Sequence, residues 1–96
     1  MSKEENYSTP SNKCLQHCSK LAITQDKPIL LDYWTDSLDG NIIIGVRDNE
    51  EKLLVKNEEE YTSPVSKIYK VDNEYIILTE NSIYIVSSKI STRKIS

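Results

Sequence analysis

The sequence predicts a mainly β fold, in which five or six antiparallel strands form a curled sheet, a small sandwich or a partly open barrel, with one short N-terminal helix. Two observations support this class. Short runs rich in β-branched residues and tyrosine alternate with turn-forming residues over most of the chain. One segment near the N-terminus instead has apolar residues at helical spacing.

We expect a single domain, because a chain of 96 residues is small enough that only roughly 60 to 65% of its unfolded surface can be buried on folding. Residues 1–11 are polar and are expected to form a disordered arm, residues 12–88 the β-rich domain, and residues 89–96 a flexible tail. No apolar run approaches the roughly 20 residues of a membrane span. The two cysteines do not make a secreted disulfide framework. These features predict a soluble cytoplasmic protein.

The predicted helix begins directly after the polar arm. Ser11 or Asn12 can cap it through a side-chain oxygen, and it extends to about Ala22. Its apolar side chains recur every three or four residues and form one stripe: Cys14, Leu15, Cys18, Leu21 and Ala22. The stripe predicts that this helix packs across one end of the strands.

Three strands are predicted in the middle of the chain: residues 29–34, 41–47 and 52–56. Asp39-Gly40 is a strong hairpin signal between the first two strands. Gly45 indicates a bulge or a place where another group packs closely against the backbone. An acidic connection, residues 57–64, leads into the last third of the chain.

The last third predicts a three-stranded meander with two-residue turns at Asp72-Asn73 and Glu80-Asn81. Its strands are residues 65–71, 74–79 and 82–86. The two turns fix the register of the following pairs: Val71 opposite Glu74, Tyr69 opposite Ile76, Ile68 opposite Ile77, Leu78 opposite Ile83, Ile77 opposite Tyr84, and Ile76 opposite Ile85.

Both faces of this meander are apolar, although a sheet with one wet face would show polar alternation. The first face carries Tyr69, Val71, Ile76, Leu78, Ile83 and Ile85. The second face carries Ile68, Tyr75, Ile77, Tyr84 and Val86. The rest of the chain offers only one short helix and three further strands as cover. We therefore expect the second face to bind a partner or another copy of the chain.

Cys14, His17 and Cys18 form the one cluster with metal or nucleophile chemistry, because a helix places them at positions i, i+3 and i+4. A structural zinc site needs four ligands, and the sequence has no other histidine or cysteine. Catalytic Cys-His pairs are normally assembled from different elements. We expect the cysteines to pack in the core, and we expect no metal, no cofactor and no catalytic residue.

Acidic residues concentrate in the middle of the chain. Residues 32–60 carry three basic and nine acidic side chains, and the whole chain has a net charge of −3. This distribution argues against direct nucleic-acid binding, which depends on clustered lysine and arginine. Glu58, Glu59 and Glu60 predict an acidic rim suited to a basic groove on a partner.

The last third of the chain contains two short motifs. Thr62-Ser63-Pro64-Val65, followed by the segment Thr79-Glu80-Asn81-Ser82-Ile83-Tyr84-Ile85-Val86, resembles the closing segment of many short uncharacterised phage and prophage proteins. The resemblance covers only the last third of the chain. It implies a mobile-element protein that acts on a host machine.

The function we expect is that of a non-enzymatic phage-type binding protein. It would engage a host protein in the host cytoplasm, for example as an inhibitor of a host defence system. The expected binding residues form an aromatic β-surface and an acidic rim: Ile68, Tyr75, Ile77, Tyr84, Glu58, Glu59 and Glu60. The alternative is a small-molecule protein that binds or sequesters a nucleotide-like ligand. Either way we expect a homo-oligomer, with no direct nucleic-acid contact and no membrane contact.

Overall fold

The computed structural model describes residues 9–95, so most of the predicted N-terminal arm, residues 1–8, lies outside the described residues. The described elements are α1 (Asn12–Gln25), β1 (Ile29–Leu30), α2 (Trp34–Leu38), β2 (Ile43–Val46), β3 (Lys52–Asn57), β4 (Glu60–Tyr61), β5 (Val65–Val71), β6 (Glu74–Thr79), β7 (Ile83–Ser87) and β8 (Ser91–Lys94). The mainly β prediction is confirmed, with eight strands where five or six were expected.

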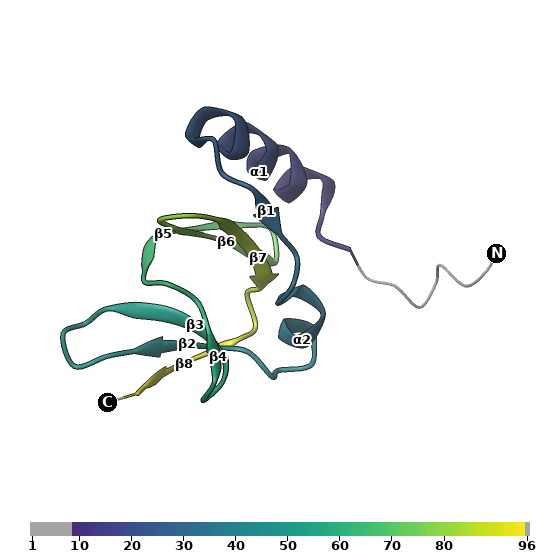
Figure 1. Cartoon of the computed structure of the whole chain (residues 1–96). Coiled ribbons are helices and arrows are strands. Elements are labelled where there is room, and N and C mark those ends of the chain that lie inside the picture. The colour runs from purple at the N-terminus through teal and green to yellow at the C-terminus, as the bar shows by residue number, and fades with distance from the viewer. Residues whose placement is uncertain (1–8, 96) are drawn as a thin grey trace.

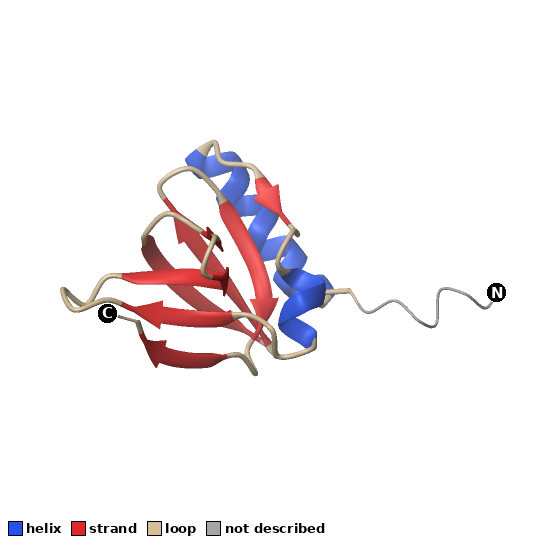
Figure 2. Ribbon diagram, turned by 60° about the horizontal axis from the view of Figure 1, so that its bottom comes forward, coloured by secondary structure: helices blue, strands red, loops and turns tan. Residues whose placement is uncertain are grey.

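The strands form two separate sheets of four strands each. Sheet A has the order β1-β7-β6-β5 and sheet B the order β4-β3-β2-β8. Helix α1, sheet A and sheet B lie one above the other as three layers (Figure 1). In the view of Figure 2, sheet B lies toward the viewer and both helices lie to one side of it. Within residues 9–95, neither sheet closes into a barrel.

The meander β5-β6-β7 is confirmed residue by residue. The structure pairs Ile68 with Ile77 and Val71 with Glu74, and it pairs Ile77 with Tyr84 on the other side. In the first turn Asp72 adopts the left-handed conformation, with φ at 54°, which tight hairpins require. The second turn is closed by the Thr79 amide, which donates to Ser82 O at 2.9 Å. The predicted register of all six pairs is correct.

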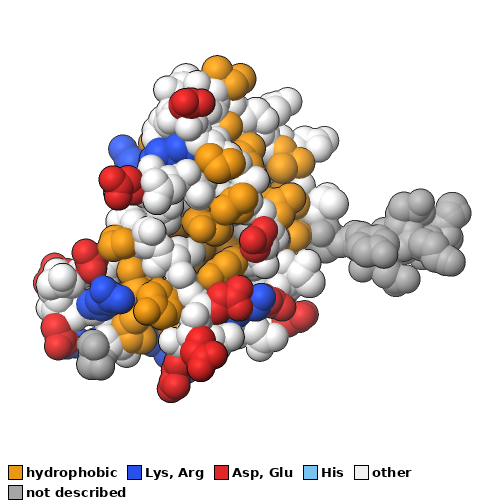
Figure 3. Space-filling model, in the orientation of Figure 1, with side chains coloured by type: hydrophobic (Ala, Val, Ile, Leu, Met, Phe, Trp, Pro, Cys, Tyr) orange, Lys and Arg blue, Asp and Glu red, His pale blue; other side chains and the backbone are white. Residues whose placement is uncertain are grey.

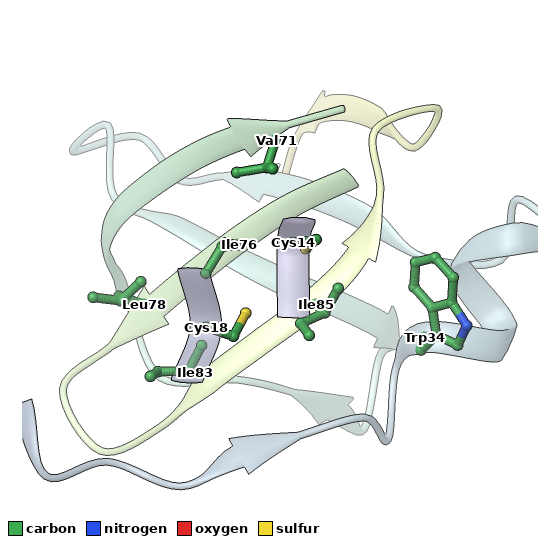
Figure 4. Packing of buried hydrophobic residues seen from close by; sticks show 8 residues of the cluster. All are labelled: Cys14, Cys18, Trp34, Val71, Ile76, Leu78, Ile83 and Ile85. Atoms are coloured by element: carbon green, nitrogen blue, oxygen red, sulfur yellow. The ribbon is translucent and has the colours of Figure 1, made fainter. Parts of the chain in front are cut away.

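Successive residues of β6 and β7 enter two different cores, because side chains alternate across a strand. The helix core lies between α1 and sheet A and consists of Cys14, Cys18, Trp34, Val71, Ile76, Leu78, Ile83 and Ile85 (Figure 4). The sandwich core lies between the two sheets and consists of Tyr33, Ile42, Ile44, Leu54, Ile77, Val86 and Ile90. Sheet A is therefore a middle layer with both faces covered.

Helix α1 begins where the sequence predicts. The Ser11 hydroxyl accepts a hydrogen bond from the Cys14 amide at 3.1 Å, which satisfies one free amide of the first turn. The same hydroxyl donates to Glu74 Oε1 at 3.0 Å. This second bond ties the start of α1 to β6.

The prediction of antiparallel strands throughout is wrong at two pairs. Strand β1 runs parallel to β7, with Ile29 opposite Ile83, and β8 runs parallel to β2, with Ile43 opposite Ser91. Parallel partners need long connections, so no local turn signal marks them. The Asp39-Gly40 hairpin is also wrong, because the strands on its two sides belong to different sheets.

Helix α2 replaces the second half of the strand predicted at residues 29–34. Its position lets neighbouring aromatic side chains enter different cores, Tyr33 the sandwich core and Trp34 the helix core. The Ser37 hydroxyl accepts a hydrogen bond from the Ser87 amide at 2.9 Å and so ties α2 to the end of β7. Gly40, with φ at 78°, turns the chain out of α2 toward sheet B.

The C-terminal segment is part of sheet B, although the sequence predicted a flexible tail for residues 89–96. Strand β8 pairs with β2, and Ile90 enters the sandwich core. Beyond the strand, the Ile95 amide donates to Val46 O at 2.8 Å. The isolated apolar residues of this polar segment are the ones that anchor it.

Candidate interaction surface

The aromatic strip predicted on the second face of the meander is not exposed, because sheet B covers it. Ile77 is 0% exposed and belongs to the sandwich core together with Val86. Ile68, Tyr75 and Tyr84 are half-buried and pack against that core. The sequence placed the uncovered face on the meander, and the structure places it elsewhere.

Tyr84 is also held by contacts within the chain. Its ring lies edge-on to Tyr33, with ring centroids 5.5 Å apart, a favourable aromatic geometry. Burial raises the pKa of both hydroxyl groups, and the charge of Glu60 adds to the rise at Tyr33. Lys56 Nζ lies 5.9 Å from the Tyr33 ring centroid and 2.9 Å from Asp36 Oδ2.

The predicted acidic rim lies at the hairpin between β3 and β4. Glu58, Glu59 and Glu60 are all exposed. The side chain of Asn57 accepts a hydrogen bond from the Glu59 amide at 2.8 Å and shapes the turn. Tyr61, the residue directly after the rim, is 51% exposed. The rim therefore borders an aromatic side chain that the sequence prediction did not select.

The uncovered face is the side of sheet B that points away from sheet A, here named the outer face. Ile42, Ile44 and Leu54 point into the sandwich core, so the alternate residues point outward. The register confirms that outward residues stand side by side across the strands. The outer face consists of Ile43, Gly45, Leu53, Val55, Tyr61, Arg93 and Ile95.

The outer face is hollowed, and apolar side chains in its middle are bordered by polar and charged ones. A groove of about 780 Å³ runs over it and is lined by Ile43, Val55, Tyr61 and Ile95 among others. Leu53 belongs to neither core, yet it is only 1% exposed. No helix or strand within residues 9–95 lies over this face.

Gly45 forms part of this surface, where the chain approaches it closely. A Cβ atom at Gly45 would lie 2.6 Å from Ile95 Cδ1 and 3.0 Å from Val55 Cγ2. The prediction that Gly45 marks a close approach to the backbone is confirmed. The side chain of Ile95, one residue beyond β8, thus packs against Gly45 on the outer face.

Charged side chains stand at both ends of the outer face. At one end stand Arg93 and Arg47, and Arg47 pairs with Glu51 at 3.4 Å. At the other end the groove reaches Glu58 of the acidic rim. Figure 3 shows hydrophobic side chains along the middle of one side of the molecule and charged ones gathered toward its lower part, where sheet B lies.

The cysteine and histidine cluster is divided by the helix. Cys14 and Cys18 are fully buried against sheet A, whereas His17 is exposed. Burial raises the pKa of Cys14 to about 11 and that of Cys18 to about 12, so both stay protonated at neutral pH. Within residues 9–95, no group of three or more His, Cys, Asp or Glu side chains is placed to hold a metal ion.

Sequence reasoning missed the outer face, although a signal for it exists. Ile42-Ile43-Ile44 and Leu53-Leu54-Val55 are continuous apolar runs, as in the meander. Such runs indicate strands with apolar residues on both faces.

Neither α1 nor the shorter helix has the length and apolarity of a membrane span in the part of the chain that the structure describes.

Comparisons with protein-family models, with curated proteins and with solved structures find no match to this chain. The functional argument therefore depends on the surfaces of the molecule.

Proposed function

We propose that the protein is a non-enzymatic binding protein that engages a host protein through the outer face of sheet B and the acidic rim. The phage-type character follows from the resemblance of the last third, and so does action in the host cytoplasm. The single observation that carries the proposal is the groove on the outer face, where apolar side chains lie beside charged ones and the described residues add no covering layer. Apolar sheet faces that stay open in a folded domain mark interfaces.

The chemistry of the face indicates the kind of partner. Tyr61 is half-exposed at its edge and offers a large ring with a hydrogen-bonding tip, which suits an interface anchor. Glu58, Glu59 and Glu60 stand beside this anchor and favour a partner with lysine or arginine around an apolar patch. The charge of the rim would speed association with the partner, and the apolar side chains of the outer face would supply most of the affinity.

The placement of the two cysteines and of His17 supports the non-enzymatic part of the proposal. The two thiols are protonated in the helix core, and the imidazole of His17 lies outside it. They therefore form no nucleophile and base pair.

Affinity capture from a host lysate, followed by binding measurements with the purified partner, tests the proposal. Tyr61→Ser is expected to weaken the affinity for the partner at least tenfold, as loss of an interface anchor does. The double change Glu58→Lys and Glu59→Lys is expected to slow association and reduce its salt dependence. Ile23→Ser is the matched control, because Ile23 is 81% exposed on α1, and this change should leave the affinity as it is.

Two outcomes would contradict the proposal. Equal affinity of the partner for Tyr61→Ser and for the parent would place the interface elsewhere. Alternatively, light scattering could show a dimer of the pure protein that Tyr61→Ser abolishes. In that case a second copy of the chain, and not a host protein, would occupy the outer face.

A further inference from the structure

The charged side chains that line the groove on the outer face fall into two groups. They are Arg47, Lys56, Glu58 and Arg93. Arg47 Nη1 pairs with Glu51 at 3.4 Å, and Lys56 Nζ pairs with Asp36 at 2.9 Å. The side chains of Glu58 and Arg93 enter no ion pair and no hydrogen bond among residues 9–95. One carboxylate and one guanidinium of the groove therefore remain available to charges of a partner.

These two charges stand at opposite edges of sheet B. Arg93 belongs to β8, the strand at one edge, and Glu58 lies in the turn between β3 and β4, the strand at the other edge. Neighbouring strands lie about 4.8 Å apart, so the two edge strands are about 14 Å apart. Both residues are exposed, and Figure 2 looks onto the face between them. The outer face is thus bordered by a positive charge on one side and by the acidic rim on the other.

Apolar side chains lie between these borders. Val55 stands opposite Ile43 on one side and opposite Tyr61 on the other. The three side chains therefore form a row across β2, β3 and β4 at one level of the sheet. Ile43 and Val55 are half-buried and Tyr61 is 51% exposed, so the row is accessible from the groove that it lines. It offers a partner an apolar contact between the two charged borders.

The geometry of a sheet face restricts the element that can cover this row. The N–H and C=O groups of strands point along the sheet toward neighbouring strands, so the outer face offers none to a covering segment. Such a segment must satisfy its own backbone groups, because unpaired ones are costly on an apolar surface. An α-helix does so, and with its side chains it is about 10–12 Å wide, which fits between borders about 14 Å apart. A single extended segment would leave its backbone groups unpaired.

Sheet A shows this arrangement in the same molecule. Helix α1 covers the face of sheet A that points away from sheet B, and its Cys14 and Cys18 pack with Ile76 and Ile85 of the strands (Figure 4). The outer face of sheet B presents the alternate residues of apolar runs in the same way. A helix is therefore the kind of element that already covers a sheet face in this fold.

We propose that the outer face binds an amphipathic helix of the host protein, with basic residues along one flank of its apolar stripe and acidic residues along the other. The stripe lies over Ile43 and Val55 and against the ring of Tyr61. The basic flank faces Glu58, and the acidic flank faces Arg93. Because the flanks differ in sign, the helix binds in one direction only. This inference rests on the proposed function, since it names the element of the partner that covers the same face.

Three synthetic helical peptides test the proposal by titration of the ¹⁵N-labelled full chain at an ionic strength of about 0.15 M, where long-range attraction is screened. Each has about 15 residues, because shorter isolated helices are marginal in water, and the same leucine stripe at helical spacing. The mixed peptide carries lysines on one flank and glutamates on the other, the acidic peptide carries glutamates on both flanks, and the basic peptide carries lysines on both. The mixed peptide should shift the amide signals of Ile43, Val55 and Tyr61. It should bind about three- to fivefold more tightly than the other two, as expected for exposed ion pairs along one flank.

Reversal of one charge of the protein sharpens the test. Arg93→Glu makes both borders of the face negative, so it should weaken binding of the mixed peptide about three- to fivefold and strengthen that of the basic peptide by a similar factor. The basic peptide should then bind more tightly than the mixed one, a reversal of order that a folding defect would not produce. Lys89→Glu is the matched control, because Lys89 is exposed between β7 and β8 and does not line the groove. It should leave the order of the three peptides unchanged.

Equal affinity of the three peptides for the parent would overturn the proposal, and so would a reversal of their order by Lys89→Glu. The proposal also fails if no peptide shifts the signals of the outer face. If a captured host partner still loses affinity with Tyr61→Ser in that case, the proposed function stands and only the helix is wrong. If light scattering shows a dimer that Arg93→Glu and Tyr61→Ser both dissociate, a second copy covers the face, and the host partner is then wrong together with the helix.

Discussion

Sheet A and sheet B are built from apolar runs of the same kind, yet they end in different environments. In β6 and β7 both sets of alternate residues are buried, one set under α1 and the other under sheet B. In β2 and β3 only one set is buried between the sheets, and the other set forms the outer face. A continuous apolar run therefore indicates two apolar faces without indicating what covers them.

The difference between the sheets comes from the order of the layers. The helix that covers sheet A precedes the strands and is fixed to β6 through Ser11 and Glu74. No helix within residues 9–95 follows β8 to cover sheet B in the same way. On the outer face, the side chain of Ile95 lies over Gly45.

The largest expected effect comes from a matched pair of isoleucines, one on each kind of face. Ile77→Ala removes a fully buried side chain from the sandwich core and should lower the free energy of unfolding by about 3 to 4 kcal/mol. Ile43→Ala removes a half-buried side chain from the outer face and should cost about 1 kcal/mol. Urea unfolding followed by circular dichroism measures both.

Equal losses would break the comparison between the sheets. They would mean that Ile43 is buried in solution as deeply as Ile77, and therefore that a second layer covers the outer face of the pure protein. Repeating the measurement at several protein concentrations would identify that layer as another copy, because the stability of a dimer depends on concentration.

The next effect concerns the thiols beneath α1 and depends on pH. Unfolded cysteines release their protons at their usual pKa of 9.0, whereas Cys14 and Cys18 hold them to about 11 and 12 in the folded protein. Their contribution to stability is thus complete below pH 9 and is lost as the pH rises toward 11. At pH 10 the loss should total roughly 2 to 3 kcal/mol, at 1.36 kcal/mol per pKa unit.

Urea unfolding at several pH values checks this loss, with the variant Cys14→Ala and Cys18→Ala as the control. The variant should be less stable at neutral pH, but its stability should fall less steeply above pH 9. Parallel curves for the two proteins would mean that the thiols are accessible to solvent and that α1 covers sheet A only loosely.

The sequence predicted sheet A better than sheet B for a physical reason. In the meander, two-residue turns fix the register locally, and the start of α1 is marked by the Ser11 cap. Strands β1 and β8 find parallel partners that are more than forty residues away in sequence, as between Ile29 and Ile83. Such pairs depend on long-range packing, which no local pattern encodes.

The candidate site was predicted in part for the same reason. The acidic rim, Glu58 to Glu60, is exposed as expected because three adjacent charges are costly to bury. Tyr75 and Tyr84 were expected on an open surface because the strands of sheet B that cover them could not be placed from the sequence. Tyr61 was overlooked because the short strand β4 has no alternation to mark its face.

A smaller effect tests the cover that Ile95 gives to the outer face. Gly45→Ala would place a Cβ atom 2.6 Å from Ile95 Cδ1 and should cost about 1 kcal/mol, the low end of overpacking, because Cδ1 is the far end of a side chain that can turn away. Ile95→Ala in the same chain should recover part of this loss, and the double-mutant cycle should give a coupling of about 0.5 kcal/mol. Thermal or urea unfolding of the four proteins provides the cycle. Strict additivity would show that Ile95 does not lie over Gly45 in solution.

The smallest effect concerns the attachment of α1, the cover that sheet B lacks. Ser11→Ala removes both the bond from the Cys14 amide and the bond to Glu74, and it should cost about 1 kcal/mol, the usual value of an N-cap. Ser19→Ala is the control, because Ser19 is exposed within α1 and alanine favours a helix. That change should leave the stability unchanged or slightly raise it. The expected difference in melting temperature is about 4 to 8 °C for a domain of this size. Equal melting temperatures would show that the Ser11 cap does not hold α1 in place, and the helix would then be as weakly fixed over sheet A as Ile95 is over sheet B.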